Sequence, residues 1–491
     1  MLRIIQDFTM RHSPYLAALL GAILMGLVIG AMGFAGAGIL IMLPVVIGFS
    51  YAFFRFPQLG LYATLILSFL LASLDRYLGS FVPYGLGTDI FLVLSFLVLF
   101  FKYFRELDLS ASYNDVVLLM ALWMGLVVLE IANPYAQSIA AWFYAMRGIA
   151  LYQLLIFGLI FTVMNHRRHM NRFLNIWLGF SLLGALWGIR QDVIGVDPFE
   201  QAWLDKGAAE THLLWGSKLR VFSYYFDAGT FGAAMGHIAT VAAILFLGPV
   251  SFRRRLLYLI ITLLCLYGLI ISGTRGALAV PGAGGIIFIL LSKNKRLIIT
   301  GATIGFLVFS FLKFTTIGQS NYDIARLRSA LNADDPSLQV RVINRQKLTR
   351  YLSNKPFGTG IGTAGYWGRR FTPYTWMANF ATDGLYTRIR AETGRIGQLF
   401  YLFIWLYILV RMGIIALKLR DPGLRYTAVA FTSGYAGILL ANYGNSVMTQ
   451  FPNSFTTLFS VAFVFMMTRW DAQGAPQIPA GEKNNLFKYR L

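Results

Sequence analysis

Charged residues, cysteine and histidine are all scarce in this chain of 491 residues. Only 13% of the residues are charged and 57% are hydrophobic, and the mean hydropathy is +0.62. Soluble domains usually carry about 25% charged residues, so the composition excludes a soluble globular protein and predicts an integral membrane protein. The single cysteine, Cys265, excludes an internal disulfide framework and a cysteine-based metal site.

Histidine gives no sign of a metal centre either. The five histidines are scattered along the chain: His12, His166, His169, His212 and His237. A metal site needs three or four ligands at a suitable spacing. We therefore expect an activity that needs neither a metal ion nor another cofactor.

Long apolar runs are what the sequence has in abundance. Each is about 17 to 25 mostly uncharged residues long, enough to cross about 30 Å of hydrocarbon as a helix. They predict an all-α polytopic membrane protein with about 12 to 14 transmembrane helices. The fourteen runs are 14–32, 36–54, 59–75, 86–101, 114–131, 138–163, 173–189, 229–248, 256–273, 276–292, 297–313, 395–416, 425–442 and 453–468. The first two are alternatively a broken or re-entrant pair, and the first is expected to be a retained anchor rather than a cleaved signal.

Basic residues predict the orientation of these spans, because cytoplasmic loops collect lysine and arginine. With the N-terminus inside, one side of the membrane receives Arg55, Lys102, Arg105, Arg167, Arg168, Arg172, Arg253, Arg254, Arg255, Lys293, Lys295, Arg296, Arg411, Lys418, Arg420 and Arg425. That side is expected to be the cytoplasm, with both termini there. The net charge of +21 is then a signal of topology and of attraction to anionic lipids, not of nucleic-acid binding.

This assignment of the spans and loops to the two sides of the membrane predicts the domain organisation. The successive parts are N-terminal helices (1–189), a first outer loop (190–228), further helices (229–313), a large outer loop (314–394), C-terminal helices (395–469) and a cytoplasmic tail (470–491). The cytoplasmic loops are too short for a nucleotide-binding domain, whereas loops as long as the two outer ones are usually functional. Any chemistry is therefore expected outside the cell.

The large outer loop is rich in arginine, contrary to the usual depletion of basic residues outside. Its arginines are Arg326, Arg328, Arg341, Arg345, Arg350, Arg369, Arg370, Arg388 and Arg390. Long loops cross the membrane largely regardless of charge, so simple tolerance is one interpretation. We prefer a function, because arginine at this density suits a ligand with phosphates.

Four arginines have sequence surroundings that suggest such a site. Arg275 lies in a tight turn between glycines, where a phosphate can approach the backbone closely, with snorkelling to the interface as the alternative. Arg220 precedes a span beside tyrosines, and an interfacial anchor is its alternative. Arg341 and Arg345 are one turn apart on a predicted amphipathic helix lying on the membrane, with a solvated face as the alternative. The glycines of segment 355–365 predict a tight turn rather than a nucleotide-binding loop.

The segment Asp383–Gly397, DGLYTRIRAETGRIG, puts acidic and basic residues at the mouth of an apolar helix. Asp383 beside a basic cluster is a candidate general base for a sugar hydroxyl, and a helix cap is the alternative. Arg388 and Glu392 are four residues apart, so they are alternatively a simple ion pair.

These motifs, in this order, resemble the O-antigen ligase/polymerase superfamily, whose members transfer lipid-linked glycans at the outer face of the bacterial inner membrane. The resemblance covers roughly residues 215 to 415. It is carried by the turn Ser272–Gly276, by Arg341, by Pro356–Gly360, and by Asp383–Tyr386 with Glu392–Gly394 and Gly397.

The resemblance implies a GT-C-like fold with one large, partly helical periplasmic loop. It implies a metal-independent glycosyltransferase of the bacterial inner (plasma) membrane, multi-pass, with its active site facing the periplasm. The implied donor is an oligosaccharide on undecaprenyl diphosphate, and the implied acceptor is a glycan or a lipid-linked molecule. Membrane lipids, a flippase and a chain-length regulator are the other partners that such a protein would have, with no nucleic acid among them.

In this interpretation Arg275 and Arg341 are catalytic, because they stabilise the negative charge that grows on the leaving diphosphate. Asp383 takes the proton of the acceptor hydroxyl. The residues expected to bind substrate are Arg220, Arg275, Arg341, Arg345, Tyr386, Arg388 and Glu392. Ligases of the family carry histidine and asparagine where this chain has Asp383 and Gly384, which favours a polymerase of repeat units of a surface or exopolysaccharide over a ligase acting on lipid A-core. A transporter or a non-catalytic envelope-assembly scaffold is the alternative from another class.

Overall fold

The structure is a computed structural model that describes residues 21–23, 25–31, 33, 40, 44, 47–79, 84–102, 110, 112–214, 218–320, 322–329 and 336–474. The chain divides into two compact units, residues 1–60 and 61–491. In the first unit, residues 47–55 are helical. The second unit holds most of α2 (Gln58–Leu78), all the later helices, and the one short two-stranded sheet found in the described ranges.

Helices dominate, as the apolar runs predict, and the all-α polytopic fold is confirmed. Eight helices in the described part of the chain are long and apolar enough to cross a membrane. They are α2 (Gln58–Leu78), α4 with η2 (Asp115–Ala132), α5 to α6 (Ile139–Val163), α7 (Arg167–Val193), α10 (Ala228–Phe246), α11 (Phe252–Ile271), α13 (Lys295–Phe314) and α18 (Leu385–Lys418). Other predicted runs coincide with α3 (Gly85–Lys102), α12 (Ala279–Leu291), α19 (Pro422–Ala441) and α20 (Asn453–Gly474). About half of each of the predicted runs 14–32 and 36–54 lies outside the described residues.

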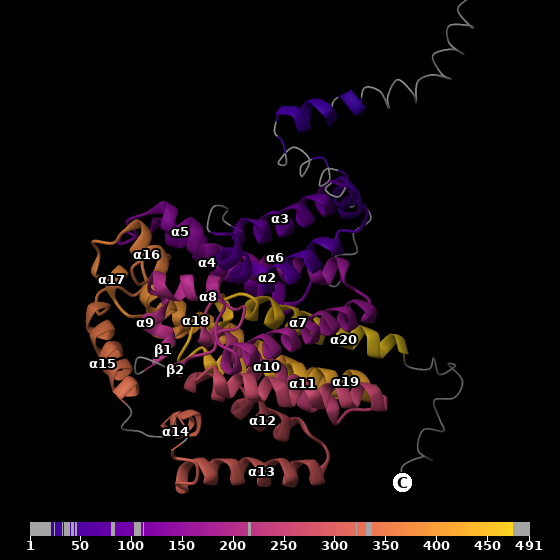
Figure 1. The fold of residues 1–491 in the computed structure, drawn as a ribbon, viewed down its shortest axis with the longest axis vertical. Coiled ribbons are helices and arrows are strands. Elements are labelled where there is room, and N and C mark those ends of the chain that lie inside the picture. The colour runs from indigo at the N-terminus through magenta and orange to yellow at the C-terminus, as the bar shows by residue number, and fades with distance from the viewer. Residues whose placement is uncertain are drawn as a thin grey trace, which may run out of the picture. The chain divides into compact units, whose positions relative to one another are not determined.

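The centre of the second unit is built from α10, α11, α12 and α19, which lie side by side in Figure 1. Almost every residue of α10 is buried, because its sequence is rich in glycine and alanine and so lets neighbouring helices approach closely. A Cβ added to Gly437 of α19 would lie 2.4 Å from the carbonyl oxygen of Val280 in α12. Small residues therefore set the spacing of this core.

Polar contacts tie helix ends that are distant in sequence. At one end of the helices, Arg167 pairs with Asp421 at 3.1 Å, and the indole of Trp470 donates to the carbonyl of Asn165 at 2.6 Å. These four residues lie at or near the ends of α7, α19, α20 and α6. The arginine-rich loops lie at the opposite ends of the same helices.

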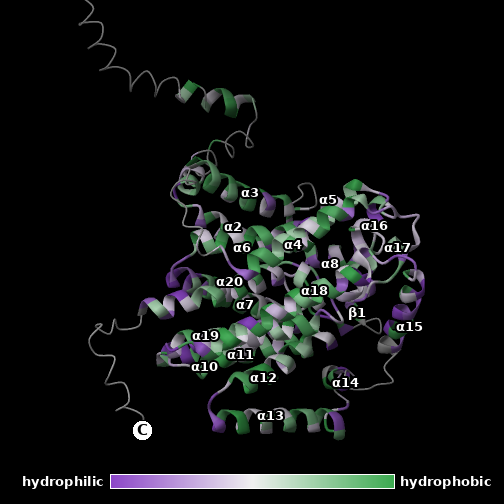
Figure 2. Cartoon of the chain, turned by 180° about the vertical axis from the view of Figure 1, so that it is seen from behind, coloured by the Kyte–Doolittle hydropathy of each residue, from purple (hydrophilic) through white to green (hydrophobic). Residues whose placement is uncertain are grey.

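The first of these loops contains α8 (Pro198–Trp203), η4 (Leu204–Ala208), α9 (Ala209–His212), β1 (Leu213–Leu214) and β2 (Lys218–Leu219). The two strands pair antiparallel. The second loop contains α14 (Tyr322–Ser329), α15 (Pro336–Tyr351), α16 (Gly365–Phe371) and α17 (Trp376–Asn379). Figure 2 shows hydrophilic colours over α15, whereas α12 and α13 are mostly hydrophobic.

The helix predicted around Arg341 and Arg345 is present as α15, but its apolar edge does not face lipid. Leu348 and Leu352 are buried in a small cluster with Ala364, Met377 and Ala391. The prediction that these two leucines face the membrane was wrong, because the loop supplies its own apolar partners. The position of α15 relative to the membrane stays a prediction. The arginines of α15 are thereby held in place by a packed loop.

Candidate functional site

The turn that follows α11 is fixed by contacts to the start of α10. Thr274 donates its hydroxyl to the carbonyl of Ala228 at 3.0 Å, and a Cβ added to Gly232 would lie 2.3 Å from Oγ of Ser272. The backbone of Gly273 has φ +56°, a left-handed conformation that suits glycine. These contacts fix the backbone of the turn and therefore the position of Arg275, the next residue.

Three arginines from different elements converge on this turn. Arg220, after β2, donates to the hydroxyl of Thr274 at 2.9 Å. Arg326 of α14 donates its Nε–H to the carbonyl of Gly273. Arg275 itself donates to Oγ of Ser329 at 3.1 Å. Arg220 and Arg275 were expected here, whereas Arg326 was not singled out by the sequence.

The convergence concentrates positive charge. Burial lowers the pKa of the Arg220 guanidinium, and the charges of Arg326 and Arg275 lower this pKa further, while Asp227 opposes the shift. The Nε of Arg220 is buried without a hydrogen-bond partner among the described residues. Arginine stays protonated in proteins, so an anion bound at this turn would relieve the repulsion.

A second pair of arginines comes from α15 and meets the end of α19. Arg341 donates to the carbonyl of Gly444 at 3.5 Å. Arg345 donates to the hydroxyl of Tyr443 and lies over its ring, with its guanidinium carbon 3.9 Å from the ring centroid. The turn at residues 442–445 thus receives the arginines of the loop helix.

Asp383 lies beside the same turn. The N–H of Leu385 donates to the carbonyl of Asn442 at 2.9 Å, and a Cβ added to Gly384 would lie 2.4 Å from the carbonyl oxygen of Tyr443. The residue that caps α18 is Gly384, and no side-chain hydrogen bond caps the N-terminus of this helix. The alternative that Asp383 is a helix cap was therefore wrong. Its carboxylate is partly exposed and does not serve the helix terminus.

The other expected residues of α18 have partners inside the protein. The hydroxyl of Tyr386 donates to the carbonyl of Leu439 at 2.6 Å. Arg388 pairs with Glu392, Nε to Oε1, at 3.2 Å, and the Glu392 side chain is fully buried. The ion pair predicted from their spacing is confirmed. Glu392 consequently holds Arg388 and does not face solvent.

The glycine-rich segment forms a tight turn, as predicted, and packs on α18. The N–H of Gly360 donates to the carbonyl of Glu392 at 2.9 Å. A Cβ added to Gly394 would lie 1.9 Å from the carbonyl oxygen of Pro356. Gly394 has non-helical dihedral angles and kinks α18. The close approach of the two backbones explains the glycines without any bound phosphate.

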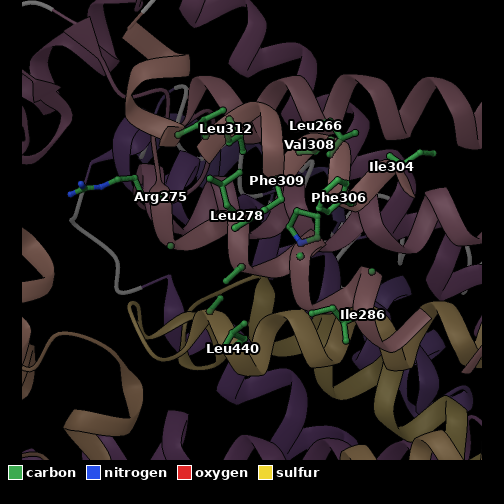
Figure 3. Close-up of a pocket in the computed structure, with 18 of the residues that line it drawn as sticks. Leu266, Arg275, Leu278, Ile286, Ile304, Phe306, Val308, Phe309, Leu312 and Leu440 are labelled. Carbon is green, nitrogen blue, oxygen red and sulfur yellow. The ribbon is translucent and has the colours of Figure 1, made fainter. Parts of the chain in front are cut away.

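A large groove opens between α12 and α13, and Arg275 lies at one end of it (Figure 3). Its volume is about 1010 Å³. Its walls are almost entirely apolar, and they include Leu266, Leu278, Ile286, Ile304, Phe306, Val308, Phe309 and Leu312. Arg275, Ser329, Arg341 and Gly444 also line it. The groove is therefore amphipathic, with an apolar length and a basic end.

α13 makes the groove possible because it stands away from the bundle. None of its residues is buried by the described part of the chain. Hydropathy predicts α13 as an ordinary span, so the groove could not be found from the sequence. The turn at residues 442–445, which reads Asn-Tyr-Gly-Asn after an apolar run, was the available signal for the polar end of the groove.

Fold and site together define a polytopic helical membrane protein with a basic cluster at one end of an apolar groove. The chain is 30% identical over 147 residues to an O-antigen polymerase of Salmonella muenchen. The similarity covers 29% of this chain and 36% of that protein. No protein-family model matches the chain. The similarity supports a relationship to O-antigen polymerases in general, and it extends over little more than a third of that relative's length.

Proposed function

We propose that the protein is a glycosyltransferase that polymerises the repeat units of a surface polysaccharide or exopolysaccharide from undecaprenyl-diphosphate-linked donors. The amphipathic groove supports this most strongly. A polyprenyl chain suits the apolar walls, because burying its hydrocarbon is favourable by about 25 cal/mol per Å². A diphosphate attached to that chain would meet Arg275 and Arg341 at the basic end.

The arginines would act on the leaving group. When the bond between the anomeric carbon and the diphosphate oxygen breaks, negative charge grows on the diphosphate. Arg275 and Arg341 would stabilise that charge with pairs of N–H donors, and Arg220, Arg326 and Arg345 would add to the positive field. These guanidiniums stay charged at any physiological pH.

Asp383 would supply the base. The oxygen of an acceptor hydroxyl attacks the anomeric carbon, and the proton of that hydroxyl passes to the Asp383 carboxylate. The new glycosidic bond replaces the bond to the diphosphate, so one undecaprenyl diphosphate is released for each linkage made. We place this site on the periplasmic face of the inner membrane, where the donor arrives already activated.

Lysine substitution tests the anion site. Arg275→Lys and Arg341→Lys keep the positive charge and lose the planar fork, so each is expected to lower the rate of polymer formation about 10²-fold. The assay uses purified protein in lipid nanodiscs with undecaprenyl-diphosphate-linked repeat units. Arg350→Lys, on an exposed position of the same helix as Arg341, is the matched control and should keep the parent rate. Equal rates for all three variants would reduce Arg275 and Arg341 to anchors.

A further inference from the structure

A second cavity lies beside the start of α18, on elements that the groove does not use. Its volume is about 430 Å³. The residues lining it come from α3, α5, the π-helical turn Arg147–Leu151, α6, α16, α18 and the segment before α20. They include Tyr144, Arg147, Trp367, Arg370 and Arg388. The cavity therefore differs from the groove in both its elements and its chemistry.

Aromatic rings form one wall of this cavity. Tyr144 and Trp367 are stacked, with ring centroids 4.8 Å apart, and Phe371 stacks on Tyr144 at 5.5 Å. Tyr144 and Trp367 are half-buried, so part of each ring remains open to the cavity. Such rings give a rigid apolar surface with little entropy to lose on binding.

Guanidinium groups from three elements face the same space. Arg147 pairs with Asp89 of α3, which also accepts from Tyr152, and Arg388 pairs with the buried Glu392. Each ion pair leaves other N–H donors of the guanidinium available. Their positions are fixed, because the partner carboxylates are mostly or fully buried.

Arg370 completes the polar side and adds uncompensated charge. Arg370 is exposed, and its guanidinium carbon lies 5.9 Å from the ring centroid of Trp367. It pairs with no carboxylate of the described residues. A cavity with an aromatic wall and several convergent donors is suited to a polyhydroxylated ring.

The backbone around Arg147 is also unusual. Residues Arg147–Leu151 form a turn of π-helix inside an otherwise α-helical span, and Arg147, Gly148 and Ile149 all line the cavity. A π-turn costs hydrogen-bond geometry and frequently marks a functional site. The ion pair of Arg147 with Asp89 lies inside predicted spans, and charged residues inside a span also mark functional sites.

From this arrangement we infer that the second cavity binds a sugar ring of the acceptor glycan. The inference rests on the proposed function, which requires two glycans at once. The donor diphosphate is assigned to the groove, and the second cavity offers ring-binding chemistry at a separate place. The first turn of α18 adjoins both, since Leu385 bonds to Asn442 near the groove and Arg388 lines the second cavity. An acceptor held there would present its hydroxyl towards Asp383.

Neighbouring arginines of α16 allow a matched test. Arg369 and Arg370 are both exposed, but only Arg370 lines the cavity. Binding is measured by calorimetry with purified full-length protein in nanodiscs. The probe is a repeat-unit oligosaccharide, without lipid or diphosphate, prepared by partial hydrolysis of the producing cell's own polysaccharide.

Arg370→Ala and Trp367→Ala should each weaken binding of this oligosaccharide at least tenfold, whereas Arg369→Ala and Arg275→Lys should bind it like the parent. If Arg370→Ala and Trp367→Ala bind as tightly as Arg369→Ala, the inference is wrong, even where Arg275→Lys blocks polymerisation and the proposed function stands. If the parent protein does not polymerise lipid-linked repeat units while Trp367→Ala loses binding of the oligosaccharide, the proposed function fails and a saccharide site remains.

Discussion

At the scale of single residues, Asp383 has the most specific role in the proposed reaction. Its neighbour Gly384 caps α18 without help from any side chain. Replacing the carboxylate therefore removes no helix cap, and effects on activity can be separated from effects on folding.

Asp383→Asn is expected to lower kcat about 10²-fold or more, because a positioned base typically contributes that much. The KM for the lipid-linked donor should change little, since the diphosphate is held by arginines. Thermal unfolding in detergent should match the parent protein. A variant with normal kcat would remove Asp383 from the mechanism.

Local spacing was enough to predict some of the residue-scale features. The pairing of Arg388 with Glu392 follows from helical periodicity alone, and the tight turn at Arg275 was predicted from its flanking glycines. The contact of Arg341 with Gly444 joins residues 103 positions apart, so no local pattern contains it. For the same reason the Tyr443 turn and Arg326 were not predicted as parts of the site.

At the scale of secondary-structure elements, α13 is the helix that forms one wall of the groove proposed to bind the lipid of the donor. Hydropathy predicts where apolar helices lie in the sequence, since each run is long enough to span a membrane. It does not show how far one helix stands from the next. The packing of Leu348 and Leu352 under the loop and the π-turn at Arg147 escape prediction likewise, because both depend on tertiary contacts.

Filling the groove tests its role. Gly305 of α13 lines the groove, and a Cβ added there meets nothing within 4 Å. Gly305→Trp should raise the KM for the undecaprenyl-linked donor by about tenfold, equivalent to about 1.4 kcal/mol of lost binding. The steady-state rate of polymer formation at varied donor concentration measures this change.

The control for this variant is on the same helix. Thr303 is exposed and does not line the groove, so Thr303→Trp should leave the KM unchanged. An equal rise in both variants would mean that the indole perturbs α13 generally and that the groove does not hold the donor.

At the scale of the whole molecule, the proposal depends on which side of the membrane carries the site. Basic residues predict that the large loop is periplasmic. Tyr374 in that loop is 76% exposed, and Ser251 at the start of α11 is exposed at the other end of the helices.

Thiol labelling tests this orientation. In intact cells with a permeabilised outer membrane, Tyr374→Cys should react with a membrane-impermeant thiol reagent, and Ser251→Cys should react only after the inner membrane is opened. The natural Cys265 is buried and should give little background. Labelling in the reverse order would place the site in the cytoplasm.

The most direct test of the central claim is reconstitution with a single substrate. Purified protein in nanodiscs is incubated with undecaprenyl-diphosphate-linked repeat units, without nucleotide sugars and without other proteins, and the products are separated by chain length. The account predicts a ladder of longer glycans and the release of one undecaprenyl diphosphate for each new linkage. Repeat units that stay unchanged, or that lose their lipid without forming longer chains, would contradict it.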